Sequence, residues 1–336
     1  MKILYVEDEL VTNIDQIERL FEKYLDDDVT EKLKAFKEKR LKRPDELKKI
    51  VEATDLIEIE YRFPDALRKI IHDHEKYSLF IIDRNLSESK YEHNEVRRID
   101  STYNNEKYEK FSRTNREGDY LLHQLILVHK VDVEKKFFFL TAYSARDELR
   151  GSEVIGEYIL MKQFTEKNFM EKGKEEDFDR LKGIIENNEI ISLIHENTDY
   201  LLILKRHIDD EAAGLFLDVL HFQNDESRIR DSLNRIRIVY ENILTVCSDV
   251  IPGMKRECGN EKGDKTILWL RNKNHIDDLI LRNFLFSIRK IANEFGSHKP
   301  YPYNPIYEPT SDTVRALVYA LKDMIIWFGK ICSKYS

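Results

Sequence analysis

The chain is poor in cysteine and glycine, and it has no long apolar run. Its three cysteines, Cys247, Cys258 and Cys332, have spacings that match no zinc site or disulfide framework, so reduced structural thiols are expected. Only 11 residues are glycine, and none of them belongs to a glycine-rich phosphate loop. No apolar run approaches the roughly 20 residues of a membrane helix, and no basic region followed by an apolar stretch marks a signal peptide. These absences predict a cytoplasmic protein that does not act on a membrane.

The charge balance restricts the partners further. Lysine and arginine number 55 against 63 aspartates and glutamates, which gives a formal net charge of −8. This balance argues against a surface that binds nucleic acid as a whole and leaves room only for a local basic patch. There is also no helix-turn-helix with a convincing recognition helix, so a DNA-binding output is not supported. A length of 336 residues indicates two domains.

Polar residues follow four short apolar runs in the first part of the chain. They are Glu7 and Asp8 after residues 3–6, Asp83 after residues 79–82, Thr141 after residues 137–140 and Lys162 after residues 158–161. Short apolar runs separated by helix-like segments predict buried parallel strands, and the ligand site of such a sheet lies beyond the carboxyl ends of its strands. The five side chains are therefore expected to converge.

The chemistry of these five residues is mutually consistent. An acidic pair with a third carboxylate can hold a hard divalent cation and still leave a carboxylate oxygen free to attack phosphorus. A hydroxyl group and an ammonium group close by would bind the oxygens of the transferred phosphoryl group. Taken singly, such residues are commonly turn, cap or surface residues. Their joint order along the chain is what predicts a site for Mg²⁺ and phosphate.

Residues 1–188 resemble the receiver domain of two-component response regulators. The segment Ile3 to Glu9 is similar to the family's first strand with its metal-binding acidic pair, and Asp83 to Leu86 is similar to its phosphoacceptor turn. Thr141-Ala142 and Lys162 match the hydroxyl position with its small neighbour and the invariant lysine. The resemblance implies an α/β fold with a flavodoxin-like, doubly wound, five-stranded parallel sheet.

The resemblance also implies a mechanism and a partner. Asp83 would accept a phosphoryl group from a sensor histidine kinase or a phosphotransfer protein. Mg²⁺ would be held by Glu7, Asp8, Asp83 and the backbone carbonyl of Asn85. Thr141 and Lys162 would bind the phosphoryl oxygens.

The chain departs from the family around the predicted fifth strand. Gln163 stands where receivers usually have a proline after the lysine, so the loop there is expected to be built differently. The family's aromatic switch residue also lies on this strand. Tyr158 is near that place, but Ile159 occupies it, which leaves tyrosine gating open.

Two insertions interrupt the resemblance. The first, residues 26–54, is rich in lysine and is interpreted as a solvated helical extension interrupted at Pro44, with a basic partner-binding helix as the alternative. The second, residues 87–116, precedes a helix predicted to begin at Gly118. It is either a flap that screens Asp83 or senses its phosphoryl group, or a mobile surface loop.

Residues 189–336 are predicted to form an all-helical output or interaction domain, after a last receiver helix over 171–186. Apolar residues recur at helical spacing over 190–205, 212–222, 227–250 and 275–295. The last helix has Ser311 or Asp312 as its N-cap and one apolar stripe, formed by Val314, Leu317, Val318, Leu321, Ile325 and Phe328. A helical bundle is the expected architecture.

Three outputs are left open for this domain. Arg289 and His298 faintly resemble the motif of HEPN-type helical ribonucleases of bacterial defence systems. In that chemistry the histidine would move protons at a ribose 2′-hydroxyl and the arginine would stabilise the phosphorane charge, so RNA is expected ahead of DNA as a nucleic-acid partner. A second alternative is a phosphotransfer or dimerisation module that uses one of the helix histidines at positions 195, 207, 221 and 275. A third is a scaffold whose receiver is never phosphorylated.

The leading prediction is a signalling protein in which Mg²⁺-dependent phosphoryl acceptance at Asp83 controls a helical output domain. Apart from self-phosphorylation and dephosphorylation at Asp83, enzyme activity is expected only under the ribonuclease alternative. Whether phosphorylation produces a homodimer is left open.

Overall fold

The chain folds into two compact units. A computed structural model describes residues 2–39, 43–103, 116–142, 153–160, 164–259, 263–276, 279–297 and 307–335. The units are Met1–His195 and Glu196–Ser336. The division falls near the end of α11 (Glu189–Glu196). The hydroxyl of Tyr24 donates a hydrogen bond to the carbonyl of Ile185, and its ring lies 5.1 Å from that of His195, so α11 stays with the first unit.

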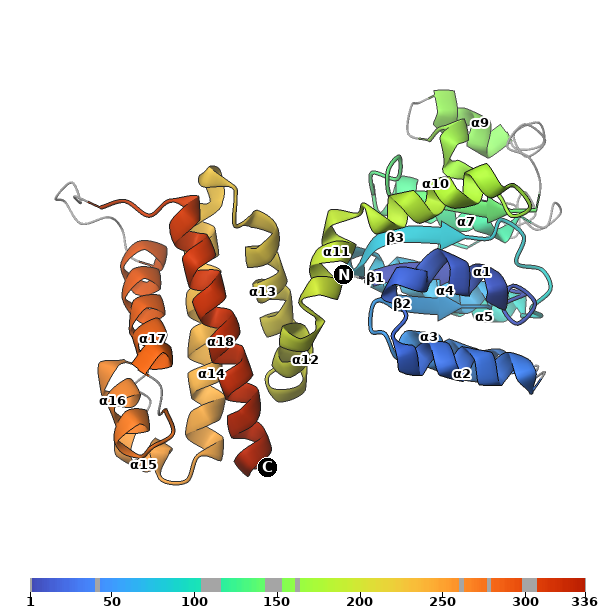
Figure 1. Ribbon diagram of the computed structural model, residues 1–336. Helices are drawn as coiled ribbons and strands as arrows, with labels where there is room; N and C mark the ends of the chain where they lie inside the picture. Colours follow the sequence, from blue (N-terminus) through green and yellow to red (C-terminus); the bar gives the residue numbers. More distant parts are fainter. Residues whose placement is uncertain are drawn as a thin grey trace. The chain divides into compact units, whose positions relative to one another are not determined.

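The first unit contains one parallel sheet (Figure 1). Its strands are β1 (Lys2–Val6), β2 (Ile57–Glu60), β3 (Tyr77–Ile82), β4 (Phe137–Thr141) and β5 (Phe169–Glu171). All neighbouring strands are parallel, and their spatial order is β2-β1-β3-β4-β5. This is the flavodoxin-like, doubly wound order, in which ligands bind where the strand order reverses, between β1 and β3. The predicted α/β class of this part is confirmed.

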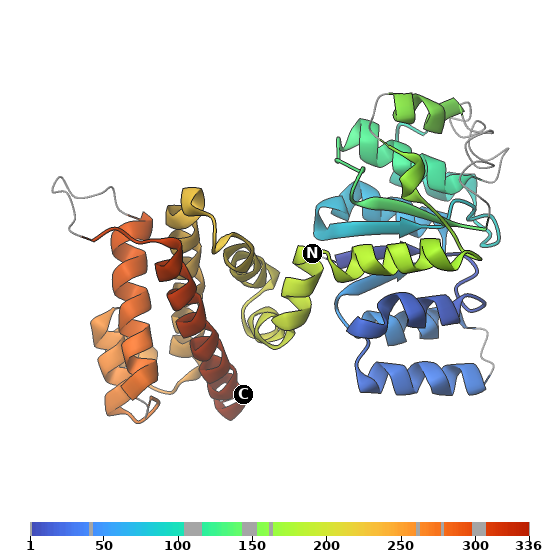
Figure 2. The ribbon, with the colours of Figure 1, turned by 45° about the horizontal axis from the view of Figure 1, so that its top comes forward.

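The strands are apolar because helices cover both faces of the sheet. Leu4 and Phe80 belong to one core cluster with side chains of α4 (Phe63–Asp73) and α7 (Glu117–His123). On the other face α1 (Ile14–Phe21) packs against α10 (Glu175–Glu186), and Figure 2 shows these two helices along the same side of the sheet. The predicted helix at Gly118 is α7, which begins one residue earlier.

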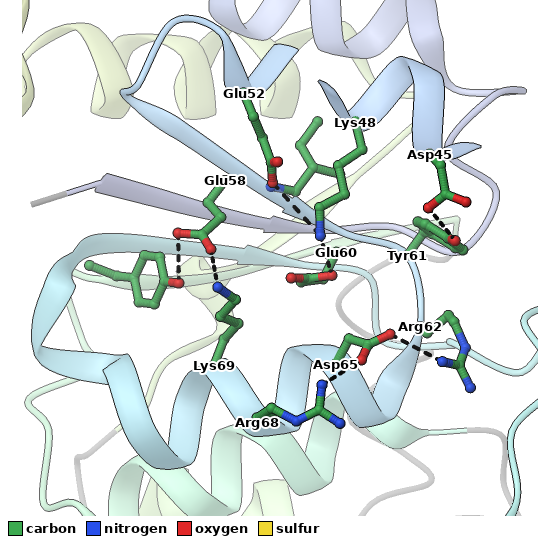
Figure 3. Close-up of polar contacts among 12 residues, drawn as sticks. Asp45, Lys48, Glu52, Glu58, Glu60, Tyr61, Arg62, Asp65, Arg68 and Lys69 are labelled. Carbon is green, nitrogen blue, oxygen red and sulfur yellow. Dashed lines mark hydrogen bonds and ion pairs between the residues drawn. The ribbon is translucent and has the colours of Figure 1, made fainter. Parts of the chain in front are cut away.

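The first insertion forms two helices, α2 (Asp27–Glu38) and α3 (Pro44–Glu52). Helix α3 packs along β2, an outer strand of the sheet. Glu52 Oε1 accepts the backbone N–H of Ile59 at 3.0 Å. Lys48 Nζ lies 2.7 Å from Glu60 Oε2, and Figure 3 shows these two side chains. The helical interpretation is confirmed, and the helices also have a packing role, because α3 covers a strand edge that would otherwise expose unpaired backbone groups.

The described part of the second insertion, residues 87–103, packs on the core. It contains α5 (His93–Ile99), and both Val96 and Tyr103 belong to the buried cluster. Asp100 accepts hydrogen bonds from the hydroxyl of Tyr120 and the amide of Gln124. The alternative of a mobile surface loop is therefore wrong for residues 93–103, which form a helix and a turn packed on the core. Residues 104–115 lie outside the described residues.

The prediction of the fifth strand was wrong. Residues 158–160 belong to the helix α9 (Glu153–Leu160), and the fifth strand is β5, eleven positions later in the chain. Tyr158 is buried in α9, with its hydroxyl 2.5 Å from His123 Nδ1, so it is not on the sheet. Lys162 and Gln163 lie outside the described residues. The sequence pattern does not predict β5, because it is a three-residue outer strand with only two apolar residues. Residues 158–161 form a longer apolar run and were predicted instead.

The described residues of the second unit form helices joined by turns and short loops, and none of them lies in a strand. Its helices are α12 (Thr198–His207), α13 (Asp210–Phe222), α14 (Ile229–Val250), α15 (Met254–Cys258), α16 (Asp264–Asn272), α17 (Leu279–Ala292) and α18 (Ser311–Tyr335). A π-helical turn, Asn293–Ser297, extends α17. α14 packs against α13, α17 and α18. Among the described helices, none is long and apolar enough to cross a membrane.

Most helix predictions for residues 189–336 are confirmed, with three corrections. The helix predicted to begin at residue 275 excludes residues 275 and 276, and α17 is described from Leu279. The predicted helix 190–205 is two helices, α11 and α12, which are separated at Asn197. α18 begins at Ser311 itself, so neither Ser311 nor Asp312 is the residue before the helix. The predicted apolar stripe of α18 is buried along its whole length.

Candidate functional site

Three acidic side chains converge at the carboxyl ends of β1 and β3. Glu7, Asp8 and Asp83 each offer one carboxylate oxygen, and these oxygens lie within 4.8 Å of one another. The register explains the convergence, because Val6 of β1 pairs with Ile82 of β3 and the next residue on each strand is acidic. Glu7 is 1% exposed and Asp83 is 8% exposed. The three predicted acidic residues are thus brought together at the point where the strand order reverses.

Backbone amides orient the three carboxylates. The N–H of Glu9 donates to Glu7 Oε1 at 3.2 Å, and the N–H of Asn85 donates to Asp83 Oδ1 at 3.1 Å. Asp8 Oδ2 accepts the N–H of Glu88 at 2.7 Å, from the start of the second insertion. Each carboxylate therefore keeps its second oxygen for another contact.

The lysine of this site is Lys172, directly after β5. Its Nζ lies 2.5 Å from Asp83 Oδ2 and 2.6 Å from Glu7 Oε2. Sequence reasoning missed this residue because it placed the fifth strand too early. Loop length could have identified the correct lysine. Strand-to-helix loops in such folds are two to six residues long, whereas a strand that ends before Lys162 would need a far longer loop to reach α10.

Thr141 is the last residue of β4 and is buried. β4 lies between β3, which carries Asp83, and β5, which carries Lys172. The carbonyl of Thr141 accepts the backbone N–H of Lys172 at 2.7 Å, which fixes the start of the loop that carries the ammonium group. Hydroxyl, ammonium and carboxylates thus come from one edge of the sheet.

Burial disfavours all three ionised carboxylates, and repulsion between the acids adds to this for Glu7 and Asp8. Burial, with a further contribution from the charge of Asp83, raises the pKa of Glu7 to about 8, although Lys172 opposes the shift. Burial also raises the pKa of Asp8 to about 6 and that of Asp83 above its ordinary value. Burial alone would lower the pKa of Lys172, but the neighbouring Glu7 and Asp83 raise it. The lysine therefore stays charged.

This donor set fits a hard divalent cation. With all three carboxylates ionised, the cluster and the ammonium of Lys172 would carry a net charge of about −2, which one bound divalent ion would balance. All the available donors are oxygens, as Mg²⁺ prefers. Burial raises the pKa values of the three acids, and the single positive charge of Lys172 offsets this only in part.

Of the second predicted pair, Arg289 and His298, only Arg289 belongs to the described residues. Arg289 lies on α17 and forms an ion pair with Asp264 of α16, and its side chain is 31% exposed. His298 lies outside the described residues. Of the four histidines predicted on helices, His207 is on α12 and packs edge-on against Phe328, whereas His275 lies in the bend after α16 and stacks on Trp269 with ring centroids 5.5 Å apart.

Comparisons of the chain with protein-family models, with curated proteins and with solved structures gave no match.

Proposed function

We propose that the first unit is a receiver-type phosphoryl acceptor in which Asp83 is phosphorylated in a Mg²⁺-dependent reaction. One observation supports this most directly: the carboxylate of Asp83 lies beside the acidic pair Glu7 and Asp8, and its Oδ2 contacts the ammonium of Lys172. An ordinary ion pair between Asp83 and Lys172 would not explain two further acids, buried Glu7 and half-buried Asp8, beside it. A nucleophile that works on a charged phosphoryl group needs both a cation site and a fixed positive charge.

The chemistry assigned to these residues is a phosphoryl transfer. A carboxylate oxygen of Asp83 attacks the phosphorus of the donor, the bond between phosphorus and the leaving group breaks, and Asp83 becomes an acyl phosphate. With acetyl phosphate as donor, the leaving group is acetate. Lys172 and Thr141 bind the phosphoryl oxygens after transfer. Mg²⁺, held by Glu7, Asp8, Asp83 and the carbonyl of Asn85, would supply charge compensation for the same oxygens.

In the cell, the donor in this proposal is a histidine kinase or a phosphotransfer protein, and the helical second unit is the output. Ribonuclease activity of the second unit stays a prediction, because His298 lies outside the described residues.

Intact-mass measurement after incubation with acetyl phosphate tests the proposal. The wild-type protein should gain the mass of one phosphoryl group with Mg²⁺ and none with a chelator. Asp83→Asn should abolish the gain, whereas Asp73→Asn, a change on α4 in the same unit, should leave it intact. A wild-type protein that gains no mass, or an Asp83→Asn variant that gains as much as wild type, would refute the proposal.

A further inference from the structure

Arg84, the residue directly after Asp83, is a buried cation. Its side chain is 1% exposed and that of its partner Asp119 is 2% exposed. Arg84 Nε lies 2.6 Å from Asp119 Oδ1, and Nη2 lies 2.7 Å from Oδ2. The two parallel bonds form a planar fork between the chain after β3 and the first turn of α7.

A fork of this kind fixes geometry more than it adds stability. Taking both charges out of water is costly, and an apolar pair of similar volume would often hold two segments together equally well. Two parallel hydrogen bonds, by contrast, fix both the distance and the relative orientation of the groups they join. The rings of Phe139 and Phe169 lie 5.8 and 5.6 Å from the guanidinium carbon and hold its plane in place.

The first turn of α7 holds the backbone on both sides of the fork. The N–H of Gly118 donates to the carbonyl of Arg84 at 3.0 Å. A Cβ atom at Gly118 would lie 2.7 Å from the carbonyl oxygen of Asp83 and 2.8 Å from the Cα of Arg84, so only glycine allows this approach. The N–H of Leu86, two residues after Arg84, donates to Glu117 Oε2 at 3.2 Å.

These contacts hold the backbone next to the nucleophile Asp83 and the proposed metal ligand Asn85. Asp83 carries the nucleophilic carboxylate, and its Oδ1 accepts the N–H of Asn85 at 3.1 Å. Asn85, whose carbonyl is a proposed metal ligand, lies between Arg84 and Leu86, and both of these are tied to α7. A change in the angle between this turn and α7 would therefore move the nucleophile and a metal ligand together.

We infer that Arg84 and Asp119 are positioning residues: their fork holds the Asp83 carboxylate and the Asn85 carbonyl in the orientation that binds the divalent cation. This inference rests on the proposed function of the site. Arg84 acts through the backbone of its neighbours, which separates it from the residues that would touch the phosphoryl group. Groups that orient metal ligands in this way typically contribute about 10- to 100-fold in metal affinity.

The test separates positioning from stability with a volume-matched double variant. Arg84→Met combined with Asp119→Leu removes the fork and both charges but keeps the packing. Its thermal midpoint should stay close to that of wild type, while its Mg²⁺ affinity, measured by calorimetric titration, should fall about 10-fold or more. Arg84→Lys keeps the charge and loses the fork, so the same loss is expected if orientation matters rather than charge.

The matched control is the Glu58–Lys69 ion pair, which joins β2 to α4 in the same unit. Glu58→Leu combined with Lys69→Met should leave Mg²⁺ affinity unchanged. If the double variant at Arg84 and Asp119 fails to fold, Asp119→Asn keeps the shape of the carboxylate and weakens the fork, and it should still lower Mg²⁺ affinity several-fold.

The outcomes separate this inference from the proposed function. Fork variants that fold and bind Mg²⁺ as tightly as wild type would overturn the inference and leave phosphorylation of Asp83 intact. A wild-type protein that neither binds Mg²⁺ nor accepts a phosphoryl group would overturn the proposed function itself.

Discussion

Lys172 compensates the charges of two buried carboxylates. Its removal should therefore lower the stability of the metal-free protein but raise its affinity for Mg²⁺. In Lys172→Met, Glu7 and Asp83 lose their partner, and the free energy of unfolding in chelator is expected to fall by about 3 kcal/mol. Mg²⁺ should bind more tightly, because the cluster becomes more negative by one charge. Phosphoryl acceptance should still fall about 100-fold or more, because a group that binds the transferred oxygens is gone.

Chemical denaturation, calorimetric titration and intact-mass kinetics measure these three effects. Lys182→Met is the control: this lysine lies on α10 and pairs with Glu22 at the surface, where ion pairs contribute about 1 kcal/mol or less. Weaker Mg²⁺ binding by Lys172→Met would show that the lysine organises the cation site rather than competing with it.

The acidic cluster also predicts how stability depends on pH in the metal-free protein. The pKa of Glu7 is raised from 4.5 to about 8 and that of Asp8 from 3.8 to about 6, so the folded state binds more protons than the unfolded state between these values. Stability should therefore fall as pH rises from about 4 to about 8. Each pKa unit corresponds to about 1.4 kcal/mol, so a loss of a few kcal/mol is expected.

Denaturant melts across this pH range, with a chelator and with saturating Mg²⁺, measure the effect. Glu7→Gln, which cannot ionise, should flatten the metal-free profile, and Mg²⁺ should do the same in the wild-type protein. A metal-free profile in which stability rises steadily from pH 5 to pH 8 would show that the carboxylates are not destabilised by their burial.

At the scale of elements, the contact between α7 and the end of β3 tolerates no added volume. Gly118→Ala would force backbone apart at the Asp83 carbonyl, and overpacking of this kind costs about 1–3 kcal/mol. Gly183→Ala on α10 is the matched control, because no atom lies within 4 Å of its added Cβ; this change should stabilise the protein by about 0.5–1 kcal/mol through helix propensity. Equal denaturation midpoints for the two variants would contradict the packing of α7 described above.

Helix α3 covers the outer strand β2, and the Glu52 carboxylate accepts the N–H of Ile59 there. Glu52→Ala should expose this amide and cost about 1 kcal/mol. Hydrogen exchange at Ile59 should become faster than in wild type, whereas Glu46→Ala, an exposed change on the same helix, should leave it unaffected. Unchanged exchange at Ile59 would mean that packing of α3 alone protects the strand.

The elements also show where sequence reasoning succeeds and where it fails. β1, β3 and β4 could be predicted because each is a run of apolar residues long enough to be buried on both faces of a sheet. β5 could not, because an outer strand needs few apolar residues, and Asn168 contributes to its position through hydrogen bonds to the carbonyls of Glu134 and Phe137. Those contacts join positions far apart in the sequence. Because the fifth strand was predicted too early in the chain, Lys172 was missed. The convergence of the three acidic residues, by contrast, was predicted from the sequence.

At the scale of the whole molecule, the chemistry is concentrated in one unit. The first unit contains the acidic cluster, Thr141, Lys172 and the Arg84–Asp119 fork, all at one edge of the sheet. The second unit has its own buried core, which includes the apolar stripe of α18. Two separate cores are expected to unfold as two transitions, since units with separate cores could in principle fold alone.

Mg²⁺ should therefore stabilise one transition and leave the other unchanged. A ligand present at about 100 times its dissociation constant stabilises the state that binds it by about 2.7 kcal/mol, which for a unit of this size corresponds to a rise of about 5–10 °C. Scanning calorimetry of the full chain with and without Mg²⁺ measures the shift. Asp8→Asn should abolish it, whereas Asp218→Asn on α13 of the second unit should preserve it. If both transitions move together, the units are energetically coupled, and the cation site would then act on the helical unit before any phosphoryl group is transferred.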